Sequence, residues 1–164
     1  MMRAGWLCLA FLTCAGLSIA ANAQQVIYIV RHGEKLDDGK DPPLSAAGEA
    51  RAARLGRMLA ASGVKAIYTT QYQRTILHAA PVARALNVSP VVHPADDTPG
   101  LLRKIAAHSA DDVVLVVGHG NTVPEILKGL GHSDAVKIEE TDFDNLFVLV
   151  PRARAAPVVG RLKY

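Results

Sequence analysis

Two apolar runs of the sequence are each followed closely by a histidine. His32 follows Arg31 after the run VIYIV at residues 26–30, and His119 follows the run VVLVV at residues 113–117. Short, continuous apolar runs rich in valine and isoleucine are typical of buried strands in a parallel sheet. Because ligands of open α/β sheets bind beyond the carboxyl ends of the strands, both histidines are expected to face one site.

The basic side chains at these strand ends predict an anion site. Arg74 lies just after another expected strand, at residues 66–70. Together with Arg31 it would bring two guanidinium groups beside His32 and His119, and these groups would repel one another unless an anion lay among them. Guanidinium groups match phosphate oxygens in bidentate pairs, and a neutral imidazole can act as a nucleophile. The alternative is that polar residues simply cap buried strands.

Strand and helix signals alternate along the chain and predict an α/β fold. The expected architecture is a three-layer α/β/α sandwich with a mostly parallel central sheet, in one domain. Further strands are expected at residues 66–70, 90–93, 147–150 and 158–164, and helices at 45–62, 71–86, 98–109 and 122–128.

Local signals set several of these boundaries. Ser45 is expected to cap the first helix, and Thr98, followed by a proline, is expected to cap the third. Pro81 predicts a kink or a restart within the second helix. The acidic segment at residues 138–145 is expected to be a solvated connection.

The first 23 residues predict a secretory signal peptide. Arg3 gives a short basic start, residues 7–19 are apolar, and the sequence ANA at 21–23 is a small-residue cleavage site. A cut after Ala23 would leave residues 24–164 as the mature domain, in the periplasm or outside the cell and without stable membrane insertion. A membrane anchor is the alternative, but the apolar segment is short for a spanning helix, which needs about 20 residues.

Composition narrows the possible partners. The formal net charge of the whole chain is +3, and loss of Arg3 with the leader lowers it by one. This balance suits an anionic ligand, whereas nucleic acid is not expected because there is no lysine-rich run or series of aromatic residues. Cys8 and Cys14 both lie in the leader, so the mature chain would hold no disulfide and no thiolate metal site. No H-x-H or H-E-x-x-H spacing indicates a metal either.

Four segments, in order along the chain, resemble the histidine phosphatase superfamily, also called phosphoglycerate mutase-like. They are VRHGEK at 30–35, PLSAAG at 43–48, TTQYQRT at 69–75 and VGHGNTVP at 117–124. The resemblance implies a phosphoglycerate mutase-like fold and a small phosphorylated substrate, with no metal or other cofactor.

The resemblance also implies a role for each matching residue. His32 would be the nucleophile that becomes phosphohistidine. Arg31 and Arg74 would clamp the phosphoryl oxygens, and His119 would complete the pocket as a charged or hydrogen-bonding partner of the same group. Other residues of the same segments, Glu34, Lys35 and Asn121, are expected to support or border the pocket.

Two departures from the family pattern leave questions open. His78 occupies a position that usually carries no charge, and it either packs on its helix or takes part in the site. The general acid is the second question, with Asp96 the first candidate. Asp97 is an alternative, although both carboxylates would also suit the start of a helix. Glu125 is the third candidate for the general acid, but Thr122 and Glu125 have the spacing of a capping box, which favours a structural role for Glu125.

These inferences predict an exported phosphatase that acts through a phosphohistidine on His32. A mutase is less expected, because the chain is small and has little insertion to enclose a sugar phosphate. Two alternatives remain. One is a non-catalytic binder of phosphate groups in the cell envelope, and the other is a protein phosphohistidine phosphatase, whose substrate would have a good leaving group.

Overall fold

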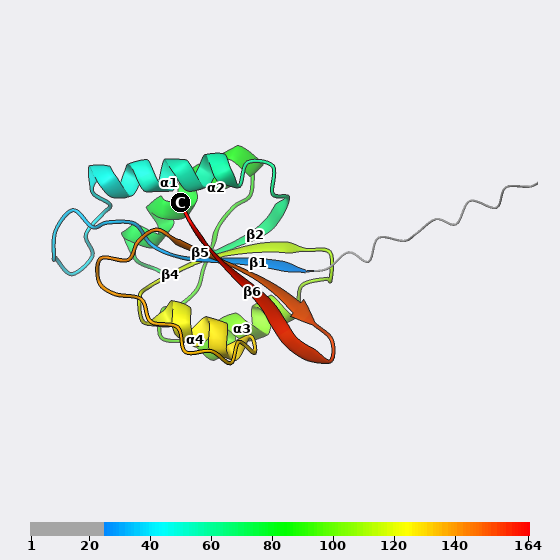
Figure 1. Ribbon diagram of the computed structural model, residues 1–164. Helices are drawn as coiled ribbons and strands as arrows, with labels where there is room; N and C mark the ends of the chain where they lie inside the picture. Colours follow the sequence, from blue (N-terminus) through cyan, green and yellow to red (C-terminus); the bar gives the residue numbers. More distant parts are fainter. Residues whose placement is uncertain (1–24) are drawn as a thin grey trace, which may run out of the picture.

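A six-stranded sheet with helices on both of its faces forms the centre of the protein (Figure 1). The computed structural model describes residues 25–164, so the expected signal peptide lies outside the described residues. The strands are β1 (Val26–Arg31), β2 (Val64–Thr69), β3 (Val91–Val92), β4 (Val113–Gly118), β5 (Asn145–Arg152) and β6 (Ala155–Lys163). The helices are α1 (Ala46–Met58), α2 (Gln73–Leu86), α3 (Thr98–Ala106) and α4 (Thr122–Gly129).

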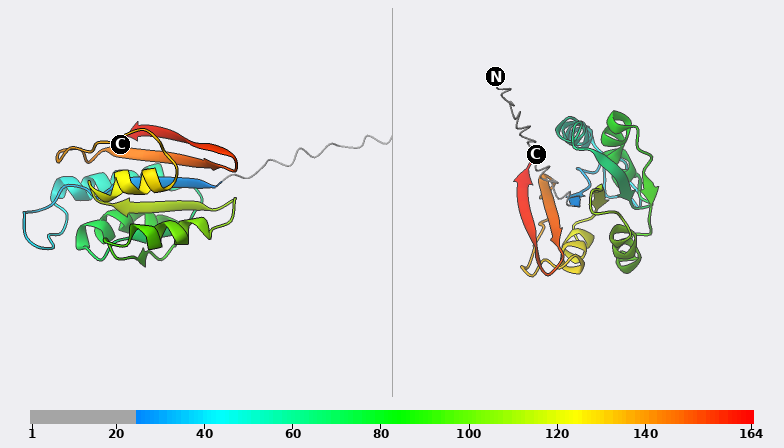
Figure 2. Two further views of the ribbon diagram at one scale, coloured as in Figure 1. Left: turned by 90° about the horizontal axis from the view of Figure 1, so that it is seen from below. Right: turned by 90° about the vertical axis from the view of Figure 1, so that its right-hand side faces the viewer.

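The sheet has the strand order β3-β2-β4-β1-β5-β6. The pairs β3·β2, β2·β4 and β4·β1 are parallel, whereas β5 and β6 pair antiparallel at the other edge, where they form a hairpin (Figure 2). Helices α1 and α2 cover one face and α3 and α4 cover the other (Figure 1). The predicted three-layer sandwich with a mostly parallel sheet is confirmed.

Both faces of the sheet are buried, which explains the continuous apolar runs in β1 and β4. Ile27 and Ile29 pack in the cluster shared with α3 and α4, whereas Val30 packs in the cluster shared with α1 and α2. Alternate residues of a strand point to opposite faces, so a strand covered on both sides must be apolar throughout. Because β1 and β4 are held in this way, the positions of the residues that follow them are also fixed.

Some local expectations need correction. Ser45 does cap α1, since its side chain accepts a hydrogen bond from the Gly48 N–H, but α1 ends at Met58. Thr98 is not the cap of α3. Asp97 takes that place and accepts from the Gly100 N–H at 2.8 Å, so Thr98 becomes the first helical residue. Either residue type can cap a helix, and the longer reach of a carboxylate satisfied the free N–H here.

Helix α2 runs through Pro81 as one element, so the helix does not restart there. The proline ring lies against α1, where a Cβ added to Gly56 would come within 2.7 Å of the Pro81 Cβ. Glycine at this contact lets the two helices approach closely. None of the helices in the described part of the chain is both long and apolar enough to cross a bilayer.

Candidate functional site

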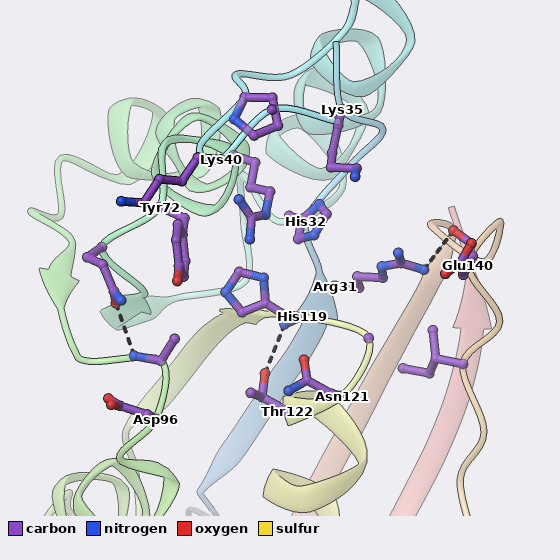
Figure 3. Close-up of a pocket in the computed structure, with 17 residues that line it drawn as sticks. Arg31, His32, Lys35, Lys40, Tyr72, Asp96, His119, Asn121, Thr122 and Glu140 are labelled. Carbon is purple, nitrogen blue, oxygen red and sulfur yellow. Dashed lines mark hydrogen bonds between the residues drawn. The ribbon is translucent and has the colours of Figure 1, made fainter. Parts of the chain in front are cut away.

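A cavity of about 660 Å³ opens beyond the carboxyl ends of β1 and β4 (Figure 3). The two strands pair in register so that Arg31 is the partner of Gly118, and His32 and His119 follow side by side. Their ring centroids are 5.2 Å apart. Arg31 and Arg74 also line the cavity, so the structure brings together all four residues that the sequence predicted at the strand ends.

His32 is held in one tautomer by its own backbone neighbour. Its Nδ1 lies 2.7 Å from the carbonyl oxygen of Gly33, and because a carbonyl can only accept, Nδ1 carries the proton. The Nε2 atom of the neutral ring therefore has a free lone pair. Burial lowers the pKa of His32 to about 4, and the nearby charges of Arg74 and Arg31 act in the same direction. The imidazole is neutral at physiological pH, as a nucleophile requires.

His119 is positioned through hydroxyl groups. Its Nε2 lies 2.9 Å from Oγ1 of Thr70, and this hydroxyl lies 2.9 Å from that of Thr75. The backbone N–H of His119 donates to Oγ1 of Thr122 at 2.9 Å. Burial lowers the pKa of His119 to about 3, and His32 and Arg74 contribute to the same shift.

Arg31 is held by the segment that precedes β5. Its Nη1 donates to the carbonyl oxygens of Glu139 at 2.7 Å and Glu140 at 3.0 Å, and its guanidinium lies 4.2 Å from the ring centroid of Phe143. Figure 3 shows the contact with Glu140. The expectation that residues 138–145 form only a solvated connection is wrong, because this segment orients a cavity arginine.

Arg74 is positioned from α2 and the loop before α1. Its guanidinium carbon lies 4.3 Å from the ring centroid of Tyr72, and Nη1 lies 3.7 Å from a carboxylate oxygen of Asp41. The Nε atoms of Arg31 and Arg74 are both buried without a hydrogen-bond partner among the described residues. Buried donors without partners are costly, so the two arginines suit an anion in the cavity they line.

The candidate acids are placed differently from one another. Asp96 lines the cavity, but its side chain is exposed and makes no hydrogen bond to either histidine in the described structure. Asp97 serves as the cap of α3. Glu125 accepts a hydrogen bond from the Thr98 hydroxyl at 3.2 Å. The capping box expected for Thr122 and Glu125 does not form, because the Thr122 hydroxyl accepts from the backbone of His119 instead.

The remaining predicted residues divide between the cavity wall and its support. Lys35 and Asn121 line the cavity. Glu34 points away to α1, where its carboxylate accepts two hydrogen bonds from the Nε and Nη2 groups of Arg51. His78 is fully buried behind the cavity, in contact with Gly33.

Sequence reasoning missed two aromatic contacts. Tyr72 lines the cavity with its ring 5.4 Å from that of His119, and Phe143 lies 6.2 Å from the ring of His32. Tyr72 stands within the segment TTQYQRT, so its place in the site was available from the motif. Phe143 was not, because its segment meets Arg31 only through folding.

Comparison with known proteins agrees with this geometry. The sequence model of the histidine phosphatase superfamily (branch 1) matches residues 27–95, which include His32 and Arg74. A search of curated proteins found no significant match. The match covers less than half of the chain, and it supports the resemblance to this superfamily that the sequence analysis identified.

Solved structures of phosphatases share the fold. SixA from Agrobacterium tumefaciens, described as a candidate phosphohistidine phosphatase, is 21% identical with a TM-score of 0.68, over 86% of this chain and 99% of that one. The protein histidine phosphatase SixA in complex with tungstate is 18% identical with a TM-score of 0.70, over 84% and 96%. Phosphoserine phosphatase from Entamoeba histolytica is 14% identical with a TM-score of 0.65, over 86% and 98%. At these identities the likeness shows the fold alone.

Within residues 25–164, no three histidine, cysteine or acidic side chains cluster closely enough to hold a metal ion. The independence from metals that the resemblance implies stays a prediction.

The lowered histidine pKa values predict a stability that falls in acid. The pKa of His119 is about 3 in the folded protein and about 6.5 when unfolded. Between these values the unfolded chain binds more protons, so the free energy of unfolding decreases as the pH falls below about 6.5. Urea denaturation of the wild type and of His119→Gln, measured from about pH 7.5 to 4, should show a smaller decrease in the variant. Parallel curves would contradict the assigned pKa.

Proposed function

We propose that this protein hydrolyses phosphomonoesters or related phosphoryl compounds through a phosphohistidine on His32. The observation that carries the proposal is the state of this side chain. His32 is buried and neutral, its Nδ1 proton is donated to the Gly33 carbonyl, and its Nε2 is free beside two arginines with unused donors. Pure binding of an anion would favour a charged group here, so a neutral histidine favours attack over mere binding.

The reaction has two steps. In the first, the Nε2 lone pair of His32 attacks phosphorus and the new N–P bond forms, while the bond from phosphorus to the leaving oxygen or nitrogen breaks and its electron pair stays on the leaving atom, which takes up a proton. In the second, water attacks phosphorus, the N–P bond breaks, and inorganic phosphate leaves a neutral imidazole behind. Arg31 and Arg74 bind the phosphoryl oxygens through both steps, since catalysis of phosphoryl transfer rests chiefly on positioning and charge stabilisation.

His119 changes its role when the anion binds. Burial and the neighbouring positive charges oppose a further proton on this ring and so lower its pKa. A bound phosphoryl group adds negative charge beside the ring, which raises the pKa of the imidazole. His119 then becomes a donor to the phosphoryl group, as the resemblance to the family implies.

The leaving group limits the choice of substrate. Asp96 is the one candidate acid that lines the cavity, and it is exposed, with no hydrogen bond fixing its side chain among the described residues. A proton donor needs to be held near the oxygen that it protonates. We therefore place substrates with good leaving groups first, including phosphoramidates such as phosphohistidine in a protein. The fold shared with SixA agrees with this second candidate function.

A panel of substrates tests the proposed function. Residues 24–164 should hydrolyse aryl phosphates and phosphoramidates, and the rate should rise as the leaving group becomes less basic. His32→Ala should abolish turnover, because no nucleophile remains, whereas His132→Ala, outside the cavity, should not change it. A chelator should leave the rate unaltered.

The same panel assigns the acid. Asp96→Asn should slow only the substrates with poor leaving groups. If no substrate is hydrolysed although phosphate binds, the protein is instead the non-catalytic binder, and loss of activity with a chelator would contradict the metal-free reaction.

We also propose that the protein is exported. The support is the sequence of residues 1–23, with its basic start, apolar segment and small residues before the expected cut. Expression of the whole chain in a Gram-negative bacterium should yield periplasmic protein whose amino terminus is Gln24. Full-length protein that stays in the cytoplasm or sediments with membranes would contradict export by a cleaved leader.

A further inference from the structure

His78 is a buried polar residue that the reaction described above does not use. It lies on α2 with no exposed surface, and both of its ring nitrogens have partners. Nδ1 accepts a hydrogen bond from the backbone N–H of Gly33 at 3.1 Å, and Nε2 lies 2.8 Å from the hydroxyl of Tyr164. An apolar residue at this position would leave the buried Gly33 N–H without this acceptor, which is costly.

The partners allow only one protonation state. An N–H group can only donate, so Nδ1 of His78 carries no proton, and the neutral ring must then carry it on Nε2. Nε2–H donates to the oxygen of Tyr164. Burial lowers the pKa of His78 to about 3, and the positive charge that His32 and Arg51 can carry adds to the shift. His78 is thus a fixed acceptor for the Gly33 N–H.

Gly33 is the link between His78 and His32. Its N–H donates to His78, and its carbonyl accepts from Nδ1 of His32. There is no room for a side chain at this position, because a Cβ on Gly33 would lie 2.9 Å from the Gly48 Cα and 3.1 Å from Nδ1 of His78. The glycine is therefore held between α1 and α2, and its orientation sets the direction of the carbonyl that selects the His32 tautomer.

The far side of His78 is also anchored. The Tyr164 backbone N–H donates to the carbonyl of Asp144 at 3.0 Å, and its carbonyl accepts from Nη1 of Arg51 at 3.0 Å. Arg51 in turn binds the carboxylate of Glu34, which directly follows Gly33. A closed ring of contacts thus joins Glu34, Arg51, Tyr164 and His78 back to the glycine.

We propose that His78 is a positioning residue for the nucleophile: by holding the Gly33 N–H it orients the backbone of this glycine, whose carbonyl in turn fixes His32 with Nδ1 protonated and Nε2 free toward the cavity. The inference rests on the proposed function in that it takes His32 as the attacking group. His78 would thus contribute to the reaction through the position of His32, although His78 itself does not touch the substrate.

Two isosteric variants separate positioning from packing. The amide oxygen of asparagine lies as many bonds from the backbone as Nδ1, whereas the amide of glutamine corresponds to Nε2. His78→Asn can therefore still accept from Gly33, and His78→Gln can reach only toward Tyr164. His78→Gln should lower kcat for an aryl phosphate about ten- to a hundredfold with little change in KM, because misplaced reacting groups cost rate more than binding. His78→Asn should restore most of kcat.

A spectroscopic readout makes the test independent of turnover. In ¹⁵N NMR spectra of the histidine side chains, the wild type and His78→Asn should show His32 as the Nδ1–H tautomer alone. His78→Gln should show a mixture of tautomers. Should His78→Gln not fold, Tyr164→Phe, which leaves Nε2–H of His78 without its acceptor, should give the same mixture in weaker form.

The results with these variants support or overturn the positioning role of His78. Unchanged kcat and an unchanged His32 tautomer in His78→Gln would overturn it, as would equal losses in both isosteric variants at equal melting temperature. If the wild type has no phosphatase activity but the tautomer of His32 still follows residue 78, the proposed function fails and the positioning role stands.

Discussion

The parallel pairing of β1 with β4 is the constraint on which the site depends. Its register makes Arg31 the partner of Gly118, and the His32 N–H then donates to the Gly118 carbonyl at 3.0 Å. A shift of one residue would turn alternate side chains to the opposite face. Both strands are apolar on both faces, so packing on both sides holds β1 and β4 within the core. The register of their pairing then determines where His32 and His119 lie beyond the strand ends. The geometry of the candidate site is thus a consequence of core packing.

Charge sets the second constraint. Two arginines and two histidines around one cavity would destabilise the fold if all were positive. Burial keeps both imidazoles neutral, and the arginines are partly satisfied, Arg31 by backbone carbonyls and Arg74 by Asp41 and Tyr72. The proposed phosphoryl group would complete the balance, because it would supply acceptors to the Nε atoms that have no partner among the described residues. Burial keeps the His32 ring neutral, whereas the two arginine side chains are what favour an anion in the cavity.

The features that could be predicted from the sequence are those that depend on a short local pattern, such as the ends of strands and the caps of helices. The apolar runs of β1 and β4 and the residues after them identified the strand ends, and the cap at Ser45 needed only its own helix. Where two neighbouring residues could both serve, as at Asp97 and Thr98, the pattern could not choose between them. Thr122 does not cap α4, because Asn121 occupies the cap position and Thr122 is the first helical residue, whose hydroxyl accepts from the His119 N–H.

Contacts between distant segments could not be predicted. Arg31 meets the carbonyl of Glu139, 108 residues away, and His78 meets Tyr164, 86 residues away. No periodicity or motif records such a pair, since the two partners lie in different segments that only the folded chain brings together. The same holds for Asp96, whose place on the cavity wall depends on the packing of α3 against the sheet. The sequence therefore predicted which residues line the cavity at the strand ends, whereas the structure showed which contacts hold them in place.

The central claim is that His32 carries the phosphoryl group during turnover. Its most direct test is to mix residues 24–164 with an aryl phosphate labelled in the phosphoryl group, quench in alkali, and locate the label in peptides. We expect an acid-labile, alkali-stable phosphoryl group on Nε2 of His32, absent from His32→Ala. Rapid hydrolysis with no label on His32 at any quench time, or label on another residue, would contradict it.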